Sequence, residues 1–241
     1  MLVKDWMTEN VVTLEEDETL EKAFKILEDF KTFRKIPITK NGKLTGIITL
    51  TDIKGLLPYK AKDIIKDPRF DEFFQELKNI PIKQVMTKDP IYTYPDETIE
   101  KASVIMLENK VSGLPVVDRN LRVVGIITET DIFRFYTLVS GVYFAPYLMG
   151  ALIGCVDDIK SIRDVLNNKI GAKISSIIMW DALFLLSHDT NLKDVMVRFQ
   201  VSKILSDVEN MVKEAFSEYE TIKVLFVRKD TIEDVPSRRW K

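Results

Sequence analysis

The sequence repeats itself at a separation of 79 residues, from Val3 to Ile82, and this duplication constrains the fold more than any other feature. Three blocks recur in the same order: residues 3–8 (VKDWMT) with 82–87 (IKQVMT), residues 36–38 (IPI) with 114–116 (LPV), and residues 46–53 (GIITLTDI) with 125–132 (GIITETDI). The middle pair is offset by one residue less, a slip that a surface turn absorbs. We therefore expect two copies of one structural unit.

Each copy is predicted to contain an opening segment, an extended stretch, a helix, two strands joined by a turn, and a closing helix. In the first copy, apolar residues at helical spacing predict a helix over 20–27, and strands are expected at 36–39 and 44–49. Asn41-Gly42 between the strands favours a type I′ turn, because both residues tolerate a positive φ. A second helical pattern, at 70–77, falls between the copies.

Composition and charge exclude several classes of protein. Hydrophobic residues make up 46% of the chain and charged residues 30%, which is typical of a globular protein. A net charge of -2 offers no general attraction for nucleic acid. Cys155 is the single cysteine, so an intrachain disulfide and a cysteine-based metal site are excluded. The first residues lack the apolar stretch of a signal peptide, and we expect a cytoplasmic protein.

Residues 135–156 favour a different location, because they contain no charged side chain and are long enough to cross a bilayer. Gly141, Pro146 and Gly150 interrupt this segment, which weakens a membrane-spanning helix without forbidding it. We expect a helix end, an aromatic linker and a buried strand here. A membrane-attached regulator is kept as an alternative.

The repeat resembles the CBS domain, and two copies in tandem resemble the pseudo-two-fold CBS pair called a Bateman module. The resemblance is carried by the opening Val/Ile-x-x-x-Met-Thr, the x-Pro-Ile/Val strand and Gly-Ile-Ile-Thr-x-Thr-Asp-Ile, each present twice. It implies a first CBS domain at residues 1–58, a connector at 59–81 and a second CBS domain at 82–138. It also implies an adenosine-containing regulatory ligand: AMP, ADP, ATP or S-adenosylmethionine.

In the blocks that contain Asp52 and Asp131, a strand is followed directly by the start of a helix. Backbone N–H groups and the helix dipole favour a phosphate at such a position. Each aspartate has two oxygens with which to hold two ribose hydroxyls, and Thr49 and Thr128 can reach ribose or phosphate. Both copies satisfy the family's nucleotide motif, Gly-hydrophobic-x-Ser/Thr-x-x-Asp. The same Thr-x-x-Asp spacing also suits a capping box, in which both side chains bind helix N–H groups.

The resemblance extends the candidate site to the adenine and the phosphate. The positions that it implies beside the adenine, with plain core as the alternative, are Thr13 and Ile36 in the first copy and Thr93 and Leu114 in the second. Arg34 stands where family members often have a basic residue for the phosphate, with a solvated surface charge as the alternative. The second copy has Ser112-Gly113 there, so we expect the two sites to differ.

Catalysis is not expected. The sequence has no Walker loop, no paired catalytic carboxylates and no nucleophile with a base, and its single histidine, His188, lies outside the repeat. We therefore predict a non-enzymatic protein with no catalytic cofactor and no metal site.

The C-terminal third predicts a ferredoxin-like βαββαβ sandwich. The expected elements are strand 149–156, helix 159–168, strands 172–180 and 195–201, helix 207–216 and strand 221–227. Residues 171–177 (GAKISSI) resemble the Gly-Ala-x-Ile-x-Ser-Ile of ACT domains, and the whole chain resembles CBS-CBS-ACT proteins grouped with acetoin-utilisation regulators. The predicted fold class is α+β, with an α/β-like character. A linker at 139–148, an ACT-like domain at 149–230 and a tail at 231–241 complete the division.

ACT domains that bind amino acids usually have a glycine in the first strand-to-helix loop, whereas this loop reads Val156-Asp157-Asp158-Ile159. Two aspartates there would repel an amino-acid carboxylate, so we expect poor amino-acid binding. The aspartates also suit the start of a helix. We therefore favour a dimerising role for this domain.

The leading hypothesis is a homodimeric regulatory protein that binds an adenosine-type ligand in the clefts of the CBS pair and acts on an unknown regulated protein. One alternative is a dimerising scaffold with empty clefts. No nucleic-acid partner is expected.

Overall fold

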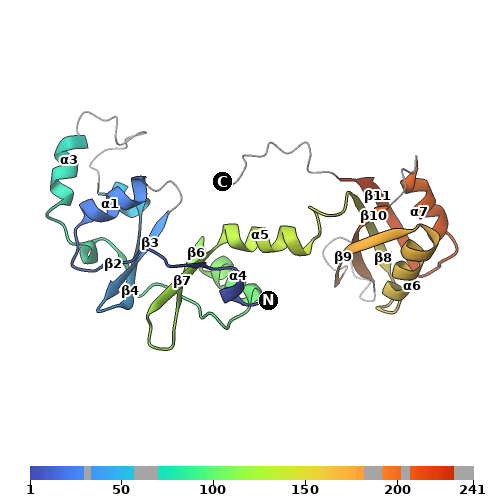
Figure 1. The fold of residues 1–241 in the computed structure, drawn as a ribbon, viewed down its shortest axis with the longest axis horizontal. Helices are drawn as coiled ribbons and strands as arrows, with labels where there is room; N and C mark the ends of the chain where they lie inside the picture. Colours follow the sequence, from blue (N-terminus) through green and yellow to red (C-terminus); the bar gives the residue numbers. More distant parts are fainter. Residues whose placement is uncertain (30–33, 57–69, 182–191, 202–206, 231–241) are drawn as a thin grey trace. The chain divides into compact units, whose positions relative to one another are not determined.

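The computed structural model describes residues 1–29, 34–56, 70–181, 192–201 and 207–230. The chain divides into two compact units, residues 1–133 and 134–241 (Figure 1). Helix α5 (Glu129–Val139) begins in the first unit and ends in the second. The unit boundary thus lies inside a helix and not in a loop.

The first copy of the repeat folds as its hydrophobic pattern predicts. Its elements are η1 (Val3–Asp5), β1 (Thr8–Glu9), β2 (Leu14–Glu15), α1 (Leu20–Asp29), β3 (Lys35–Lys40), β4 (Lys43–Thr49) and α2 (Leu50–Lys54). Asn41 and Gly42 have φ angles of 52° and 75°, as the predicted type I′ turn requires. Helix α3 (Phe70–Leu77) follows, at the predicted position.

The second copy repeats this order. Its elements are η2 (Ile82–Gln84), β5 (Thr87–Lys88), α4 (Ile99–Asn109), β6 (Gly113–Val117), β7 (Val123–Thr128) and α5. Thr98 caps α4 by accepting a hydrogen bond from the Lys101 N–H at 3.1 Å. Fully buried side chains on both copies' strands and helices, including Leu20, Ile48 and Ile127, form the core of the first unit.

The two copies exchange their opening strands. Strand β1 of the first copy pairs with β7 of the second, and β5 of the second copy pairs with β4 of the first. The sheets are therefore β1-β7-β6 and β2-β3-β4-β5, and each contains strands of both copies. The backbone N–H groups of Val3 and Ile82 likewise donate across, to the carbonyls of Glu97 and Glu18. Neither copy is complete without the other.

This exchange explains two residue types that the repeat shares. A Cβ on Gly125 would lie 2.6 Å from the Met7 sulfur, and a Cβ on Gly46 would collide with the Met86 sulfur. The methionine of each opening block thus packs directly on the glycine of the other copy. Close packing therefore favours glycine at both positions.

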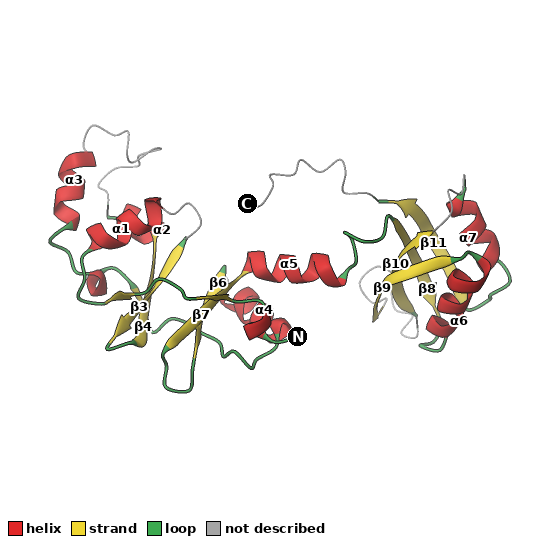
Figure 2. Ribbon diagram, viewed as in Figure 1, coloured by secondary structure: helices red, strands yellow, loops and turns green. Residues whose placement is uncertain are grey.

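The second unit contains the predicted βαββαβ order. Its elements are β8 (Tyr147–Ile153), α6 (Asp158–Asp164) with a π-helical turn (Val165–Lys169), β9 (Ala172–Asp181), β10 (Lys193–Val201), α7 (Val208–Phe216) and β11 (Ile222–Lys229). The antiparallel strand order is β11-β8-β10-β9, and α6 and α7 cover one face of the sheet (Figure 2). Met149, Val197 and Phe199 are fully buried beneath these helices.

Residues 135–156 do not form a membrane-spanning helix. Helix α5 ends at Val139, and strand β8 begins at Tyr147. Within the described parts of the chain, no helix is long and apolar enough to span a bilayer. The expectation of a helix end, a linker and a buried strand is confirmed for this segment.

Candidate functional site

The repeated blocks end in the same local structure, the N-terminus of a helix. In the first copy the backbone N–H and the hydroxyl of Thr49 both donate to Oδ2 of Asp52, each at 2.7 Å. The Asp52 N–H donates to the Thr49 hydroxyl in return, at 3.3 Å. Thr49 and Asp52 therefore form the capping box that the sequence left open as an alternative.

The second copy has the same bonds from Thr128 to Oδ2 of Asp131, at 2.9 Å from the backbone N–H and 2.7 Å from the hydroxyl. Asp131 is buried, with 5% of its surface exposed, whereas Asp52 is half-buried. The cap at Asp52 engages one carboxylate oxygen only. Among the described residues, Oδ1 of Asp52 accepts no hydrogen bond.

Lys35 contacts the structure around both helix starts. The sequence analysis did not single out this residue. Lys35 lies opposite Thr49 in the β3–β4 pair, and Gly113 lies opposite Thr128 in the β6–β7 pair. The Lys35 ammonium donates to the Ser112 hydroxyl at 2.8 Å and would lie 3.3 Å from a Cβ on Gly113. One lysine of the first copy thus reaches the second copy's strand-to-helix motif.

The electrostatics of Lys35 follow from its position. Burial lowers the pKa of its ammonium below the ordinary lysine value, and the carboxylate of Glu129 raises the pKa in part. A half-buried ammonium beside hydroxyls is suited to an anion such as a phosphate. Arg34, the predicted phosphate partner, is exposed. In the sequence, the one indication of Lys35 was a positively charged residue two positions before the motif proline, Pro37.

The predicted adenine positions divide into buried and exposed ones. Ile36 and Leu114 are 1% and 0% exposed and pair across the strands with Ile48 and Ile127. Their side chains belong to the core, which was the alternative for both.

Thr13 and Thr93 do not occupy equivalent positions. Leu14 pairs with Ile38, and Thr93 pairs with Val116. Ile38 and Val116 are equivalent, because each directly follows the motif proline of its copy. Thr93 therefore corresponds to Leu14, as the 79-residue offset already implied, and Thr13 is exposed. The Thr93 hydroxyl is buried and has no hydrogen-bond partner among the described residues.

The first strand-to-helix loop of the second unit is closed by Asp158. Its Oδ2 accepts from the N–H groups of Gly154 and Cys155, both at 3.1 Å, and its Oδ1 accepts from the Thr221 hydroxyl at 2.8 Å. The backbone N–H groups of this loop are therefore already bound to a carboxylate. An amino-acid carboxylate would have to displace Asp158.

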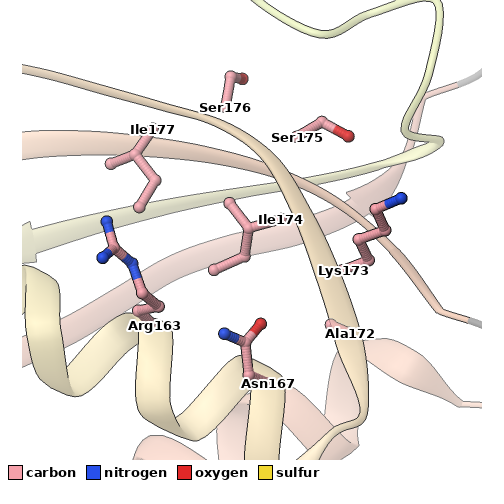
Figure 3. A pocket seen from close by; sticks show the side chains of 8 residues that line it. All are labelled: Arg163, Asn167, Ala172, Lys173, Ile174, Ser175, Ser176 and Ile177. Atoms are coloured by element: carbon pink, nitrogen blue, oxygen red, sulfur yellow. The ribbon is translucent and has the colours of Figure 1, made fainter.

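A wide cavity of about 610 Å³ lies elsewhere in this unit, between α6 and the edge strand β9. Arg163 and Asn167 point from the helix toward Ile174 and Ile177 on the strand (Figure 3). Lys173 adds a second positive charge at its rim. The cavity contains none of the predicted nucleotide residues.

Comparison with known proteins bears on the first unit. The model of the CBS domain matches residues 3–59 and 82–137, the two exchanged copies described above. Protein MJ1426 of Methanocaldococcus jannaschii is 31% identical over 152 residues, which cover 56% of this chain and 90% of that protein. This chain belongs to the CBS-domain family. Its first unit is a tandem CBS pair.

Two further similarities concern the CBS pair alone. The homoserine O-acetyltransferase of Methanococcus vannielii is 36% identical over 57% of this chain but only 25% of that enzyme. The solved CBS pair of protein MJ0100, in complex with 5′-methylthioadenosine and S-adenosyl-L-methionine, is 32% identical over 56% of this chain and 95% of that structure, with a TM-score of 0.44. The chain spans a quarter to a half of the length of the first curated relatives.

The match to the acetyltransferase covers only 25% of that enzyme, so the activity of the enzyme is not carried over to this chain. CBS pairs are typically regulatory modules. The ACT resemblance of the second unit remains a prediction.

Proposed function

We propose that this protein is a regulatory sensor that binds an adenosine-bearing nucleotide at the two strand-to-helix motifs of its CBS pair. The observation that carries the proposal is the meeting of the two motifs at Lys35, which lies opposite Thr49 and bonds to Ser112. Family membership supports a regulatory role. The ligand class rests on the chemistry of the motif residues.

Ribose recognition is assigned to Asp52 and Asp131. A cap that uses Oδ2 leaves the second oxygen of Asp52 without a partner among the described residues. A carboxylate oxygen that accepts from a ribose hydroxyl forms a charge-assisted hydrogen bond, which contributes about 1.5 to 3 kcal/mol. The same aspartate can therefore cap the helix and bind ribose at once.

Phosphate recognition is assigned to Lys35, with Arg34, Thr49 and Thr128 as further candidates. Lys35 is partly desolvated and lies beside the N-terminus of α5, so an anion there has both a cation and helix N–H groups to bind. In the second copy, the unpartnered hydroxyl of Thr93 supports an adenine position, because a ring nitrogen could accept its hydrogen bond.

Signal transfer and dimerisation complete the proposal. Helix α5 has Asp131 in its first turn and continues into the second unit, so a ligand bound at Asp131 acts directly on a helix that both units share. The exposed edge strand β9 and the ACT-like resemblance of residues 171–177 support a homodimer through the second unit.

The test replaces Asp52 and Asp131 by asparagine, singly and together. An asparagine oxygen still accepts the cap bonds from threonine, whereas its NH₂ group cannot accept from a ribose hydroxyl. Calorimetric titration with AMP, ADP, ATP, S-adenosylmethionine and 5′-methylthioadenosine should show the affinity of each altered site falling about ten- to a hundredfold. The melting temperature of the ligand-free protein should change little.

The matched control is Asp207→Asn, which changes an aspartate that caps α7 through a 3.1 Å bond from the Asn210 N–H. It should leave every nucleotide affinity unchanged. If none of the nucleotides binds the unaltered protein, or if the double variant binds as tightly as the unaltered protein, the ribose assignment is wrong.

A further inference from the structure

A second cavity, of about 150 Å³, lies on the face of the C-terminal sheet that α6 and α7 do not cover. Alternation along β10 explains which residues line it: Val197 points to the helices, so Met196 and Arg198 point to the opposite face. The last turns of α5 close it, with Tyr136 and Ser140 in its wall. This cavity is separate from the candidate nucleotide site.

Arg198 is the charged residue in the lining of this cavity, and it is 9% exposed. Its Nη2 donates to Asp230 Oδ2 at 2.6 Å, and its Nη1 donates to the Ala145 carbonyl at 3.4 Å. A guanidinium has five N–H donors, and within the described residues Arg198 makes no further hydrogen bond. Three donors of a buried cation therefore have no protein partner among those residues.

The charge around Arg198 decides which ligand can use those donors. Asp230 already neutralises the guanidinium, so a second carboxylate would leave a net negative charge in a largely apolar cavity. A hydrocarbon would leave the N–H groups without a partner. An uncharged oxygen acceptor satisfies the donors without adding charge.

Size and lining limit the ligand further. Leu148, Ile178 and Met196 provide apolar walls, and the Ser176 hydroxyl is already committed to the Ser140 carbonyl at 2.6 Å. An apolar protein cavity of about 150 Å³ accommodates a molecule the size of benzene. The ligand therefore has about six or seven non-hydrogen atoms.

We propose that this cavity is a binding site for a small uncharged carbonyl compound, whose oxygen accepts hydrogen bonds from Arg198 and whose carbon skeleton packs on Leu148, Ile178 and Met196. The proposal does not depend on nucleotide binding by the CBS pair. It assigns a ligand to the second unit at a place other than the loop that Asp158 closes.

The test uses the full chain and three cyclic probes that fit the size limit: cyclopentanone, cyclopentane and cyclobutanecarboxylate. Binding is followed by NMR titration of the Met196 methyl group and the Arg198 Nε–H. We expect cyclopentanone to saturate both signals, and each of the other two probes to bind at least about tenfold more weakly, the loss of one hydrogen bond to a charged group.

Two variants and one control distinguish recognition by charge from simple filling of the cavity. Asp230→Asn removes the neutralising charge, so cyclobutanecarboxylate should then bind more tightly than cyclopentanone. Asp181→Asn, an exposed acid of the same unit that pairs with Lys193, is the matched control and should keep the original ranking. Met196→Trp fills the cavity and should abolish binding of all three probes.

Each remaining outcome would overturn the proposal. Cyclopentane binding as tightly as the ketone would show that Arg198 takes no part. A carboxylate preference in the unaltered protein would show that Asp230 does not neutralise the site. Absence of binding by every probe would show that the cavity holds water only.

Discussion

The ammonium group of Lys35 lies half-buried between the two CBS copies, where it donates to Ser112 at 2.8 Å. Burial of this charge lowers the pKa of Lys35, and the Glu129 carboxylate offsets only part of that effect. A charge that is partly desolvated and incompletely neutralised costs stability in the ligand-free protein. The phosphate of the proposed ligand would complete the neutralisation of the Lys35 charge.

Lys35→Met should therefore separate stability from binding. The variant should be more stable than the unaltered protein at neutral pH, and its affinity for AMP should fall about ten- to a hundredfold, with little effect on adenosine. Thermal denaturation and calorimetric titration measure the two effects. A variant that loses stability and keeps its AMP affinity would contradict the role of Lys35.

The same residue predicts a pH dependence. Because the pKa of Lys35 is lower in the folded protein than the ordinary value of 10.5, the unfolded chain binds more protons between those two values. The contribution of Lys35 to stability therefore rises with pH across that window. Denaturant unfolding at several alkaline pH values should show this rise in the unaltered protein, and a smaller one in Lys35→Met.

Sequence alone singled out Asp52 and Asp131 as candidate binding residues, because the motif around each is local and occurs twice. It missed Lys35, because the residue that Lys35 contacts, Ser112, is 77 positions away and no local pattern reports such a contact. Thr13 and Thr93 are not equivalent positions: the 79-residue offset matches Thr93 to Leu14, and the strand register agrees with that match.

At the scale of elements, the exchange of β1 and β5 between the copies depends on two close contacts between glycine and methionine. A Cβ on Gly125 would lie 2.9 Å from the Thr8 carbonyl oxygen, part of a paired backbone that cannot move away. A Cβ on Gly46 would meet only the flexible end of the Met86 side chain. Gly46 should therefore tolerate substitution by a larger residue better than Gly125.

Gly125→Ala should destabilise the protein by about 1 to 3 kcal/mol, the usual cost of overpacking a tight contact. Gly46→Ala should cost less, since Met86 can change its rotamer. Urea denaturation of both variants makes the comparison. Equal losses would show that β1 is free to shift along with Thr8.

The hydrophobic pattern predicted most elements, including the Asn41-Gly42 turn and helix α3. It did not predict β1 and β5 as strands, because two-residue strands have no periodicity of their own. Their conformation comes from partners in the other copy. The order of the second unit was predictable for the opposite reason, since β9 and β10 are long, at 10 and 9 residues.

For the whole molecule, we expect a homodimer in which the edge strand β9 contributes to the contact. Light scattering should give twice the chain mass. Ser175→Lys places a charge on the exposed part of this edge and should favour the monomer. Ser217→Lys, at an exposed position beyond α7, is the matched control and should leave the dimer intact. A monomer for the unaltered chain would rule out this arrangement.

The exchanged strands also fix an order of events during synthesis on the ribosome. Thr8 pairs with Ile126, which is made 118 residues later. At a synthesis rate of about 5 to 20 residues per second, the partner of β1 is made roughly 6 to 24 seconds after β1 itself. In the first part of that interval, before Thr87 and Lys88 are made, the nascent first copy exposes the backbone of β4 that β5 will occupy, and the chain is open to pairing with a neighbouring nascent chain on the same message.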